Sequence, residues 1–395
     1  MTHYDIIIIG AGPAGLSFAR SLADTDLQIA ILERMPAKIL KNPPEDGRDI
    51  ALTHTSEQIM QDLGMWAHIP ADQTGTIRDA KVVNGQSAYA LHFESEKTDR
   101  DYLGRIVPNH LIRRAAYTVV KDLANVTILT EAEVVDVDIN ATLGKITLKD
   151  GAVLSTTLVI AADSRFSDTR RKMGISASMT DFGRVVIVCE MDHTLAHNNI
   201  ATECFHYDQT LAILPMHGNT SSVVVTLPSD KADSVMNMSD TDFAADIQAR
   251  FGDQLGDMTL ASKRHPYPLV GVYANQFVKP RFALLGDAAV GMHPVTAHGF
   301  NLGLTGGVIL ANEIRHACEI GMDFSAFSVL KKYEAKHRRI ARPLYLGTNA
   351  LVRLFTDTRP PARILRGAAL RIGNLLPPVK DRILQQLTKI EARVG

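Results

Sequence analysis

Apolar runs of strand length alternate with helical patterns in the first part of the chain. Residues 4–9 and 28–32 are mostly apolar, and residues 14–23 between them have the spacing of a helix. Strands that are apolar on both faces are typical of a parallel sheet buried between two layers of helices. Similar strands are predicted at 126–129, 158–162 and 282–285. The pattern therefore predicts a doubly wound α/β unit built from segments that lie far apart in the sequence.

The middle of the chain changes to short strands that follow one another without a long helix. Their predicted ranges are 185–191, 201–207, 211–216 and 222–227. An Asn84-Gly85 turn between residues 78–83 and 88–93 predicts a further hairpin. We therefore predict an α/β fold class in which a Rossmann-like domain carries an inserted, mostly antiparallel β-sheet and is followed by a helical C-terminal region.

Helices and short hairpins complete the predicted elements. Helices are predicted at 53–63, 108–123, 241–251, 299–317 and 324–354. A strand is predicted at 131–138, and residues 145–148 form a hairpin with the segment that starts at Val153. Residues 41–48, which are rich in Gly, Pro and charge, are predicted as a loop.

A glycine-rich turn joins the first predicted strand to the first predicted helix. Gly10 allows a tight turn, Gly12 lets the backbone approach a pyrophosphate, and Gly15 lets the helix pack on the strand. Glu33 closes the next strand 18 residues beyond Gly15, where a carboxylate accepts a hydrogen bond from a ribose hydroxyl. Because strand, glycines, helix, strand and acid follow in order, this stretch predicts a dinucleotide site rather than a chance glycine-rich turn.

A second candidate binding stretch occupies residues 281–304. Asp287 follows a predicted strand and so lies at its carboxyl end, where open α/β sheets hold ligands. Gly299 opens a helix whose N-terminal N–H groups and dipole favour an electron-rich ring or a phosphate. His293 and Pro294 form the turn between these features, and His293 is interpreted either as a proton donor at the reacting edge or as a plain turn histidine.

Charge is distributed unevenly along the chain. The 395 residues carry a net charge of −1, which argues against a general attraction to nucleic acid. Residues 331–395 nevertheless contain 15 Lys or Arg against 4 Asp or Glu, mixed with apolar residues. This basic amphipathic pattern suits an acidic membrane surface or an acidic partner, and equally a solvated helix that packs one face on its own domain.

The three cysteines, Cys189, Cys204 and Cys318, stand far apart and form no CxxC pair. We expect them to be buried apolar residues, with no disulfide and no metal site, in a reducing compartment. The N-terminus lacks the basic region of a signal peptide, and no apolar run is long enough to span a bilayer. We therefore expect a cytoplasmic protein, with any membrane contact peripheral and at the inner face of the cell membrane.

Three separated stretches together resemble one family of enzymes. They are GAGPAG at 10–15 with Glu33, LVIAADSRFSDTRRKMGI at 158–175, and LLGDAAVGMHPVTAHGFNLGL at 284–304. In order and spacing they are similar to the FAD-dependent aromatic hydroxylases, and most closely to the branch that acts in ubiquinone biosynthesis. The stretches 47–66 and 349–355 are also similar to that branch, so the resemblance covers nearly the whole chain.

The resemblance implies which residues bind FAD and which lie near the substrate. The implied cofactor-binding residues are Gly10, Gly12, Pro13, Ala14, Gly15, Glu33, Arg34, Arg48, Asp163, Gly286, Asp287, Gly299, Phe300 and Asn301. By composition alone Arg48 is a solvated side chain in a charged loop, whereas the match makes it a flavin contact. The candidates at the reacting edge are His293 and Pro294, and those in the pocket roof, which are alternatively plain core residues, are Tyr207, Leu214, Pro215 and Met216.

The resemblance also implies a division into domains. The FAD-binding domain is expected at 1–72, 103–180 and 272–340, the substrate domain at 73–102 and 181–271, and a helical basic tail at 341–395. The inserted sheet would then form a roof over the ligand end of the FAD-binding domain.

The reaction that the resemblance implies is hydroxylation of an aromatic ring. Reduced flavin reacts with O2 to give a C4a-hydroperoxide, which transfers oxygen to a polyprenylated phenol or quinol such as a demethoxyubiquinol. NAD(P)H or another electron donor reduces the flavin. The family has Asp-Gly where this chain has Asp163-Ser164, and the added side chain bears on hydride delivery from NAD(P)H more than on FAD binding.

Two other functions remain open at the level of sequence. One is hydroxylation of a soluble aromatic compound. The other is a non-catalytic FAD-binding subunit or scaffold of a quinone-biosynthesis complex, which would have other ubiquinone-biosynthesis proteins as partners. Nucleic acid is not an expected partner.

Overall fold

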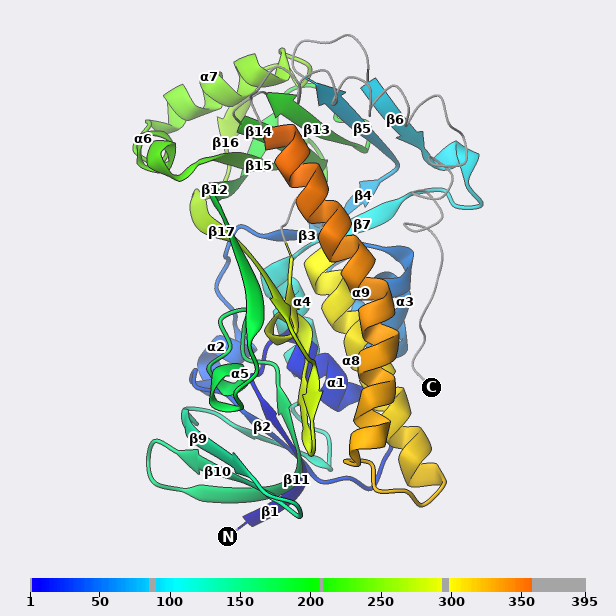
Figure 1. The fold of residues 1–395 in the computed structure, drawn as a ribbon. Coiled ribbons are helices and arrows are strands. Elements are labelled where there is room, and N and C mark those ends of the chain that lie inside the picture. The colour runs from blue at the N-terminus through cyan, green and yellow to red at the C-terminus, as the bar shows by residue number, and fades with distance from the viewer. Residues whose placement is uncertain (1, 85–89, 207–208, 293–297, 357–395) are drawn as a thin grey trace.

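A mostly parallel sheet forms the lower part of the molecule in Figure 1, in a computed structural model that describes residues 2–84, 90–206, 209–292 and 298–356. Its described strands are β1 Thr2–Ile9, β2 Ile29–Leu32, β8 Val126–Leu129, β9 Val134–Ile139, β10 Gly144–Leu148, β11 Val153–Ala161, β18 Val278–Lys279 and β19 Phe282–Leu284. They run in the order β18-β19-β11-β1-β2-β8, and β10 joins β9 to β11. The side chains of Ile6, Ile7 and Ile8 in the central β1 are fully buried. The apolar runs of the sequence thus become strands covered on both faces.

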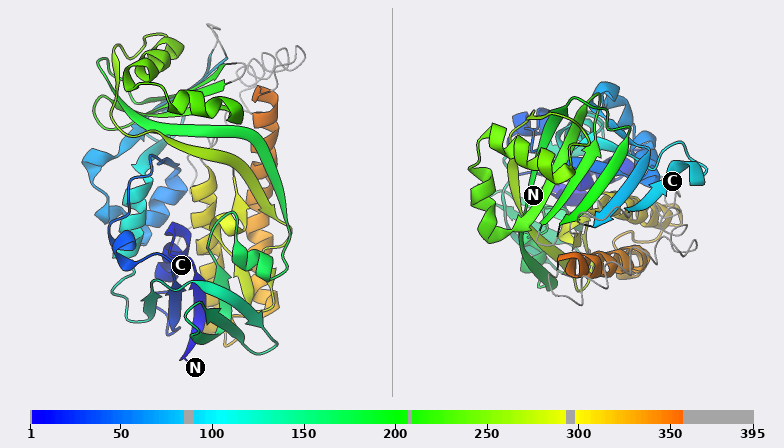
Figure 2. Two further views of the ribbon diagram at one scale, coloured as in Figure 1. Left: turned by 90° about the vertical axis from the view of Figure 1, so that its left-hand side faces the viewer. Right: turned by 90° about the horizontal axis from the view of Figure 1, so that it is seen from above.

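The described α-helices pack around the lower sheet and, in the upper part of the molecule, on the roof sheet (Figure 1). Their bounds are α1 Pro13–Ser21, α2 Ala37–Lys41, α3 His54–Asp62, α4 Asn109–Thr118, α5 Asp168–Lys172, α6 Ala232–Met236, α7 Asp240–Phe251, α8 His298–Glu319 and α9 Phe327–Thr356. α1 packs on α8, and α8 packs on α9, so two long helices lie side by side from the lower sheet towards the top of the molecule (Figures 1 and 2).

A second sheet roofs the upper part of the molecule. Its described strands are β5 Asp79–Asn84, β6 Ala90–Glu94, β12 Ala177–His193, β13 Ile200–His206, β14 Gln209–Pro215, β15 Thr220–Pro228, β16 Met258–Leu260, β17 His265–Ala274 and β20 Val290–Gly291. Among the described strands of this second sheet, only β5 and β13 pair in parallel, and the other pairs are antiparallel. α6 and α7 cover the outer face (Figure 2), where Phe243 and Ile247 pack into a cluster with Cys189.

A small three-stranded sheet lies between the two larger ones. Its strands are β3 Asp49–Leu52, β4 Gly75–Ile77 and β7 Gly104–Pro108, in the order β3-β7-β4. A Cβ added to Gly75 would lie 1.9 Å from the carbonyl oxygen of Pro215, so only glycine allows β4 to approach the end of β14 this closely. None of these three strands was predicted from the sequence.

Two long strands connect the lower and upper parts of the molecule. β12 spans 17 residues and pairs with β17, with a register shift between Asp181 and Val185. The expected domain boundaries after residues 180 and 271 fall inside these two strands. The division into domains therefore stays a prediction, and the two parts share continuous backbone pairing.

Several predicted elements differ from the structure in their extent, among them the strand predicted at 185–191, which is part of the longer β12. The helix predicted at 108–123 ends at Thr118, because β-branched residues follow and Val120 turns into the core, where it is fully buried. The strand predicted at 158–162 and the hairpin segment that starts at Val153 are one continuous strand, β11. The short helices α2, α5 and α6 were not predicted.

The burial of the cysteines matches the expectation at two of three positions. Cys189 and Cys204 are buried, and burial raises the pKa of each thiol to about 12. Cys318 is exposed near the C-terminal end of α8, so the expectation of burial was wrong there.

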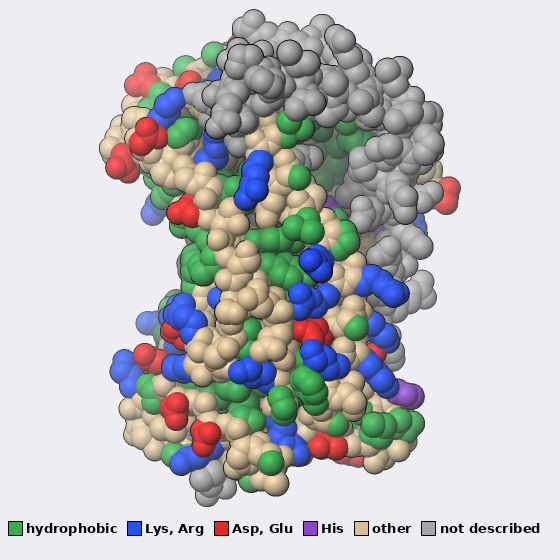
Figure 3. Space-filling model, viewed as in Figure 1, with side chains coloured by type: hydrophobic (Ala, Val, Ile, Leu, Met, Phe, Trp, Pro, Cys, Tyr) green, Lys and Arg blue, Asp and Glu red, His purple; other side chains and the backbone are tan. Residues whose placement is uncertain are grey.

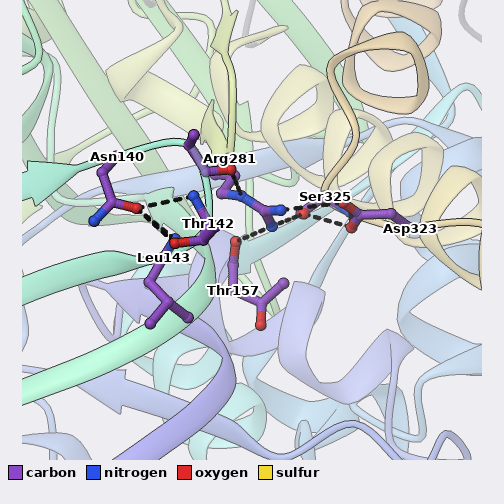
Figure 4. A network of polar contacts seen from close by, with 8 residues as sticks. Asn140, Thr142, Leu143, Thr157, Arg281, Asp323 and Ser325 are labelled. Carbon is purple, nitrogen blue, oxygen red and sulfur yellow. Dashed lines mark hydrogen bonds and ion pairs between the residues drawn. The ribbon is translucent and has the colours of Figure 1, made fainter.

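Arg281 fixes the start of β19 from several sides. Its guanidinium donates to the carbonyl oxygens of Ala141 and Thr157 and to the Ser325 hydroxyl, and it pairs with Asp323 (Figure 4). These contacts tie the β9–β10 turn, β11 and the α8–α9 connection to the strand that leads into the second candidate binding stretch.

The predicted fold class is confirmed: the chain is α/β, with a mostly parallel sheet, a mostly antiparallel roof and C-terminal helices. Residues 341–356 of the expected tail lie in α9, and 357–395 lie outside the described residues. Within the described part of the chain, no helix combines the length and the hydropathy that crossing a membrane requires.

Candidate functional site

The glycine-rich turn lies at the carboxyl end of β1. Gly10 has a φ of +110°, and a Cβ added there would lie 2.5 Å from the carbonyl oxygen of Ala162, just beyond β11. A Cβ added to Gly15 would lie 2.2 Å from the carbonyl oxygen of Gly10. Both positions therefore require glycine, because turn, helix and neighbouring strand meet there without room for a side chain.

Gly12 differs from these two glycines because the space beside it is open. A Cβ added to Gly12 would meet no atom within 4 Å. Gly12 is the N-cap of α1, no side chain caps the helix, and Pro13 follows in the first turn. The N–H groups of that turn and the positive end of the helix dipole thus face a space that an anion can enter.

Gly286 brings the second candidate binding stretch against the glycine-rich turn and α1. It has a φ of +59°, and a Cβ added to it would lie 2.9 Å from the Cβ of Ala14 in α1. Gly303 in α8 packs on its other side, where an added Cβ would lie 3.3 Å from the Gly286 Cα. Asp287 follows in a short turn at the end of β19. Two stretches from opposite ends of the sequence therefore meet at one edge of the sheet.

Asp163 and Arg165 add the third stretch to this edge. Asp163 Oδ2 accepts a hydrogen bond from the Thr169 N–H at 3.2 Å, while its buried Oδ1 has no partner among the described residues. Arg165 donates to Asp287 Oδ2 at 3.2 Å and to the carbonyl oxygen of Val270. Arg165 was not predicted as a site residue, although its place two residues after Asp163 was the available signal.

Glu33 approaches the glycine-rich turn from β2. Its Oε2 accepts from the Ala11 N–H at 2.9 Å, and its Oε1 accepts from the Met35 N–H at 2.9 Å. The carboxylate is therefore held beside the turn and keeps lone pairs for a further donor. Arg34 is exposed next to it.

Arg48 is exposed in its loop and takes part in a polar cluster there. Its guanidinium pairs with Asp46 at 2.6 Å and lies 5.5 Å from the ring centre of Tyr267. Asp46 also accepts a hydrogen bond from the Asn109 amide. Burial lowers the pKa of Arg48, but the hydrogen bond and charge of Asp46 outweigh this effect, so the pKa lies above its ordinary value.

The first turn of α8 carries the predicted residues 299–301. Asn301 is buried, and its amide donates to the carbonyl oxygen of Ala51 at 2.9 Å while its Oδ1 accepts from the Thr53 N–H at 3.1 Å. These bonds fix the start of α8 against β3 and the N-cap of α3. The Asn301 side chain thus forms its hydrogen bonds within the protein. The groups of this turn that are left for a ligand are those of the backbone.

An apolar cavity of about 310 Å³ lies between the start of α8 and the roof sheet. Its lining residues from β5, β6, β13 and β14 include Ala80, Val82, Phe93, Ala201, Glu203 and Leu214. His298 and Asn301 line it from α8. The structure therefore places the predicted pocket residue Leu214 in a cavity that begins at the second binding stretch.

A larger cavity of about 1190 Å³, with many polar side chains in its walls, is lined by Arg48 and by the predicted residue Met216. Asp49 also lines it, and burial raises the pKa of that carboxyl to about 7, although a hydrogen bond from Ser222 opposes the rise. Leu214 and Met216 thus line different cavities, and Pro215 between them packs its carbonyl against β4.

Three predicted residues, His293, Pro294 and Tyr207, lie outside the described residues. In the part of the chain that the structure describes, no group of three or more His, Cys, Asp or Glu is placed to hold a metal ion. The apolar walls from β5 and β6 and the carboxyl of Glu203 were not predicted as site features, because their position depends on how distant strands pair.

Comparison with known proteins agrees with these observations. A family model described as an FAD binding domain matches residues 3–345. Ubiquinone hydroxylase UbiM of Neisseria meningitidis is 50% identical over 390 residues, which cover 98% of this chain and 85% of that protein. Ubiquinone hydroxylase UbiL of Rhodospirillum rubrum is 33% identical over 375 residues, which cover 94% of this chain and 87% of that protein.

A solved structure shares the fold over the whole length. The p-nitrophenol 4-monooxygenase PnpA of Pseudomonas putida superposes with a TM-score of 0.80 at 17% sequence identity, covering 99% of each chain. The family match and the two relatives extend over nearly all of the sequence and confirm the resemblance inferred from its motifs. The chain therefore belongs to the family of FAD-dependent monooxygenases that includes these ubiquinone hydroxylases.

Proposed function

We propose that this monooxygenase hydroxylates the aromatic ring of a polyprenylated phenol or quinol, such as a demethoxyubiquinol, in ubiquinone biosynthesis. The names of the two relatives support this substrate class. The observation that carries the proposal is the apolar cavity of about 310 Å³ at the start of α8. A cavity whose exposed surface is mostly apolar suits a ring that carries an apolar chain, because apolar surface removed from water stabilises the complex.

The residues around the glycine-rich turn fit FAD. The open space beside Gly12, the uncapped start of α1 and the unpaired Oδ1 of Asp163 all lie where a dinucleotide needs donors and acceptors. Within the proposal, α1 binds the pyrophosphate, Glu33 accepts from a ribose hydroxyl, and Asp287 accepts from the ribityl chain. Arg48 and the backbone of residues 299–301 lie beside the flavin ring.

Bound FAD supplies the reaction with O2 by which one oxygen atom enters the substrate ring. The chain contributes the surroundings of that reaction. Apolar walls such as Leu214 and Phe93 exclude water from the ring, and the N-terminal end of α8 stabilises negative charge beside it. We place His293 and Pro294 at the reacting edge and Tyr207 in the roof, with Pro215 and Met216 supporting the roof.

NAD(P)H, or another electron donor, is the proposed source of reducing equivalents. Ser164 is exposed at the end of β11, next to the aspartate that faces the glycine-rich turn. A side chain at this position narrows the approach of a second nucleotide. We therefore propose that NAD(P)H reduces the bound flavin directly but slowly.

Ser164→Gly is expected to speed anaerobic flavin reduction by NADPH about tenfold, which corresponds to about 1.4 kcal/mol of barrier. The measurement is stopped-flow absorbance of the flavin, and reduction by dithionite serves as the control that the substitution leaves unchanged. An unchanged NADPH rate would show that this serine does not limit hydride delivery.

We also propose peripheral contact with the inner face of the cell membrane. Basic side chains are spread over the middle and lower part of the face seen in Figure 3, including the region of α8 and α9. Lys332, Arg339 and Arg342 of α9 are exposed. Leu346 on the same helix is 54% exposed. Cations beside an exposed apolar side chain favour an anionic bilayer surface or other ubiquinone-biosynthesis proteins.

The test of the proposed function is a single turnover with a prenylated phenol. The purified yellow protein is reduced without oxygen and then mixed with O2 and the phenol, and the products are separated by chromatography. We expect a hydroxylated ring, and much weaker turnover when the prenyl chain is missing. Appearance of all reducing equivalents as hydrogen peroxide with every phenol would exclude this function and favour an FAD-binding subunit without catalysis.

A further inference from the structure

Glu203 is a carboxyl group on the apolar face of the roof sheet. It lies in β13 between Ala201 and Phe205, which point to the same face and are buried in one apolar cluster. Its register partners are Ala212 in β14 and Val82 in β5, neither of which carries charge. The pattern of the strand calls for an apolar residue at this position, so the carboxyl needs a separate explanation.

Glu203 lines the apolar cavity in which we place the substrate ring. Other titratable groups in the lining are Lys81 from β5 and His298 from the start of α8. β14 contributes only Thr210, Ala212 and Leu214 to this face. Part of the Glu203 surface remains accessible, in the cavity that it lines.

The surroundings of Glu203 destabilise its ionised form. Burial raises the pKa of its carboxyl to about 8, although a hydrogen bond with the Thr210 side chain opposes the rise. A carboxyl whose pKa is about 8 can gain or lose a proton near neutral pH. A buried polar group without full partners is costly, and a ligand that supplies the partner recovers that cost.

We propose that Glu203 binds the hydroxyl group of the substrate ring and accepts its proton. The inference rests on the proposed function, because it assumes that an aromatic hydroxyl compound occupies the cavity. It makes Glu203 a catalytic residue, since its oxygen atoms touch the substrate. The cavity would then select substrates in which a ring hydroxyl group lies next to an apolar chain.

The proton transfer increases the reactivity of the ring. The O–H bond of the phenol breaks, its electron pair stays on the oxygen, and the proton forms a bond to a Glu203 carboxylate oxygen. The resulting phenolate has more electron density at its ortho and para carbons, which are the positions open to an electrophilic oxygen atom. One of these carbons forms a bond to an oxygen atom of O2, whose reduction the bound FAD would supply. The same carbon then loses its hydrogen as a proton, which goes to the other oxygen atom of O2 as that atom leaves as water. The ring is then aromatic again, and the phenolate oxygen regains a proton from Glu203.

The role proposed for Glu203 predicts that ring hydroxylation becomes faster as the pH rises. The active form of Glu203 is the ionised carboxylate, so kcat/KM for ring hydroxylation should rise by about tenfold per pH unit below the pKa and level off above about 8. Lys81 and His298 also line the cavity, so a pH-dependent change in rate that persists when Glu203 is replaced would belong to a group other than Glu203.

Two substitutions separate proton transfer from hydrogen bonding. Glu203→Gln keeps a hydrogen-bonding group of the same size but cannot accept the proton, so kcat should fall about 100-fold or more and the rise with pH should disappear. Glu203→Asp keeps the carboxylate and should retain the rise at a reduced rate. Asp192→Asn makes the same chemical change on β12 outside both cavities and is expected to behave as the parent protein.

A binding measurement tests the same contact without turnover. The probes are a prenylated phenol and its analogue in which hydrogen replaces the hydroxyl, titrated into the oxidised holoenzyme while flavin fluorescence is recorded. The parent protein and Glu203→Gln should bind the phenol at least about tenfold more tightly than the analogue, whereas Glu203→Leu should bind both about equally.

These outcomes distinguish a failed inference from a failed function. A parent protein that hydroxylates the phenol with a flat pH profile, or a Glu203→Gln variant with the parent's rate and profile, would overturn the role of Glu203 alone. Equal binding of phenol and analogue by the parent protein would overturn it as well. Absence of hydroxylation by the parent protein, with the binding preference intact, would instead overturn the proposed function.

Discussion

Gly12→Ala is expected to weaken FAD binding by about tenfold or more while the apo protein loses only about 1 kcal/mol of folding free energy. The open space beside Gly12 accommodates a methyl group in the free protein, because an added Cβ meets no atom within 4 Å. In the proposed binding mode, the pyrophosphate approaches the start of α1 through the same space. Isothermal titration of the apo protein with FAD measures the first effect, and urea unfolding of the apo protein measures the second.

Gly15→Ala provides the matched contrast. Its Cβ would lie 2.2 Å from the backbone oxygen of Gly10, which cannot move without opening the turn. We expect a loss of folding free energy of about 3 kcal/mol or more, together with loss of the flavin. If Gly12→Ala bound FAD as tightly as the parent protein, the pyrophosphate would not lie at this turn.

Asp287→Ala is expected to lower FAD affinity about 10- to 100-fold, since hydrogen bonds to a charged group contribute ~1.5–3 kcal/mol. Asp287 is held by Arg165 at the end of β19, beside the turn formed by Gly286. Removing the carboxylate takes away the proposed acceptor for the ribityl chain and leaves Arg165 with only the Val270 carbonyl oxygen as a partner among those named above. The ratio of flavin to protein after purification, and then the dissociation constant of FAD, measure the loss.

Asp24→Ala is the control for this substitution. It breaks an Asp–Arg ion pair as well, with Arg315, but at the other end of α1 from the glycine-rich turn. Its flavin content should match that of the parent protein. Unchanged flavin content in Asp287→Ala would contradict the placement of the cofactor at this edge of the sheet.

The sequence predicts the cofactor side of the site because local geometry determines it. Gly10 and Gly15 are needed wherever a strand, a tight turn and a helix meet this closely, so the glycine pattern alone locates the turn. Asp287 follows from the apolar run before it, since a buried parallel strand places its next residues at the ligand edge. The roles of these residues remain proposals, although the structure brings them together.

The substrate side could not be predicted in the same way. Glu203 lies next to Val82 and Ala212 only because β13 pairs with β5 and β14, and strand alternation does not specify those partners. Arg165 is one charged residue among several near β11 until the structure places it against Asp287. Non-local pairing therefore decides which polar residues become part of the cavity.

The end of α4 and the position of β3 could not be predicted from the sequence for the same reason. α4 stops at Thr118 because the following residues pack into the core, a tertiary effect that helical spacing alone does not contain. The short β3 at Asp49–Leu52 has no pattern of its own and exists because β7 pairs with it. Its position matters for function, since Ala51 and Thr53 hold Asn301 at the start of α8.

Isotope labelling of the product tests the proposed reaction most directly. The reduced holoenzyme is mixed with oxygen-18 gas and a prenylated phenol in ordinary water, and the product is analysed by mass spectrometry. We predict one new hydroxyl group on the ring whose oxygen comes from the gas, with the prenyl chain unchanged. A product whose new oxygen comes from water, or formation of labelled hydrogen peroxide without any ring product, would contradict it.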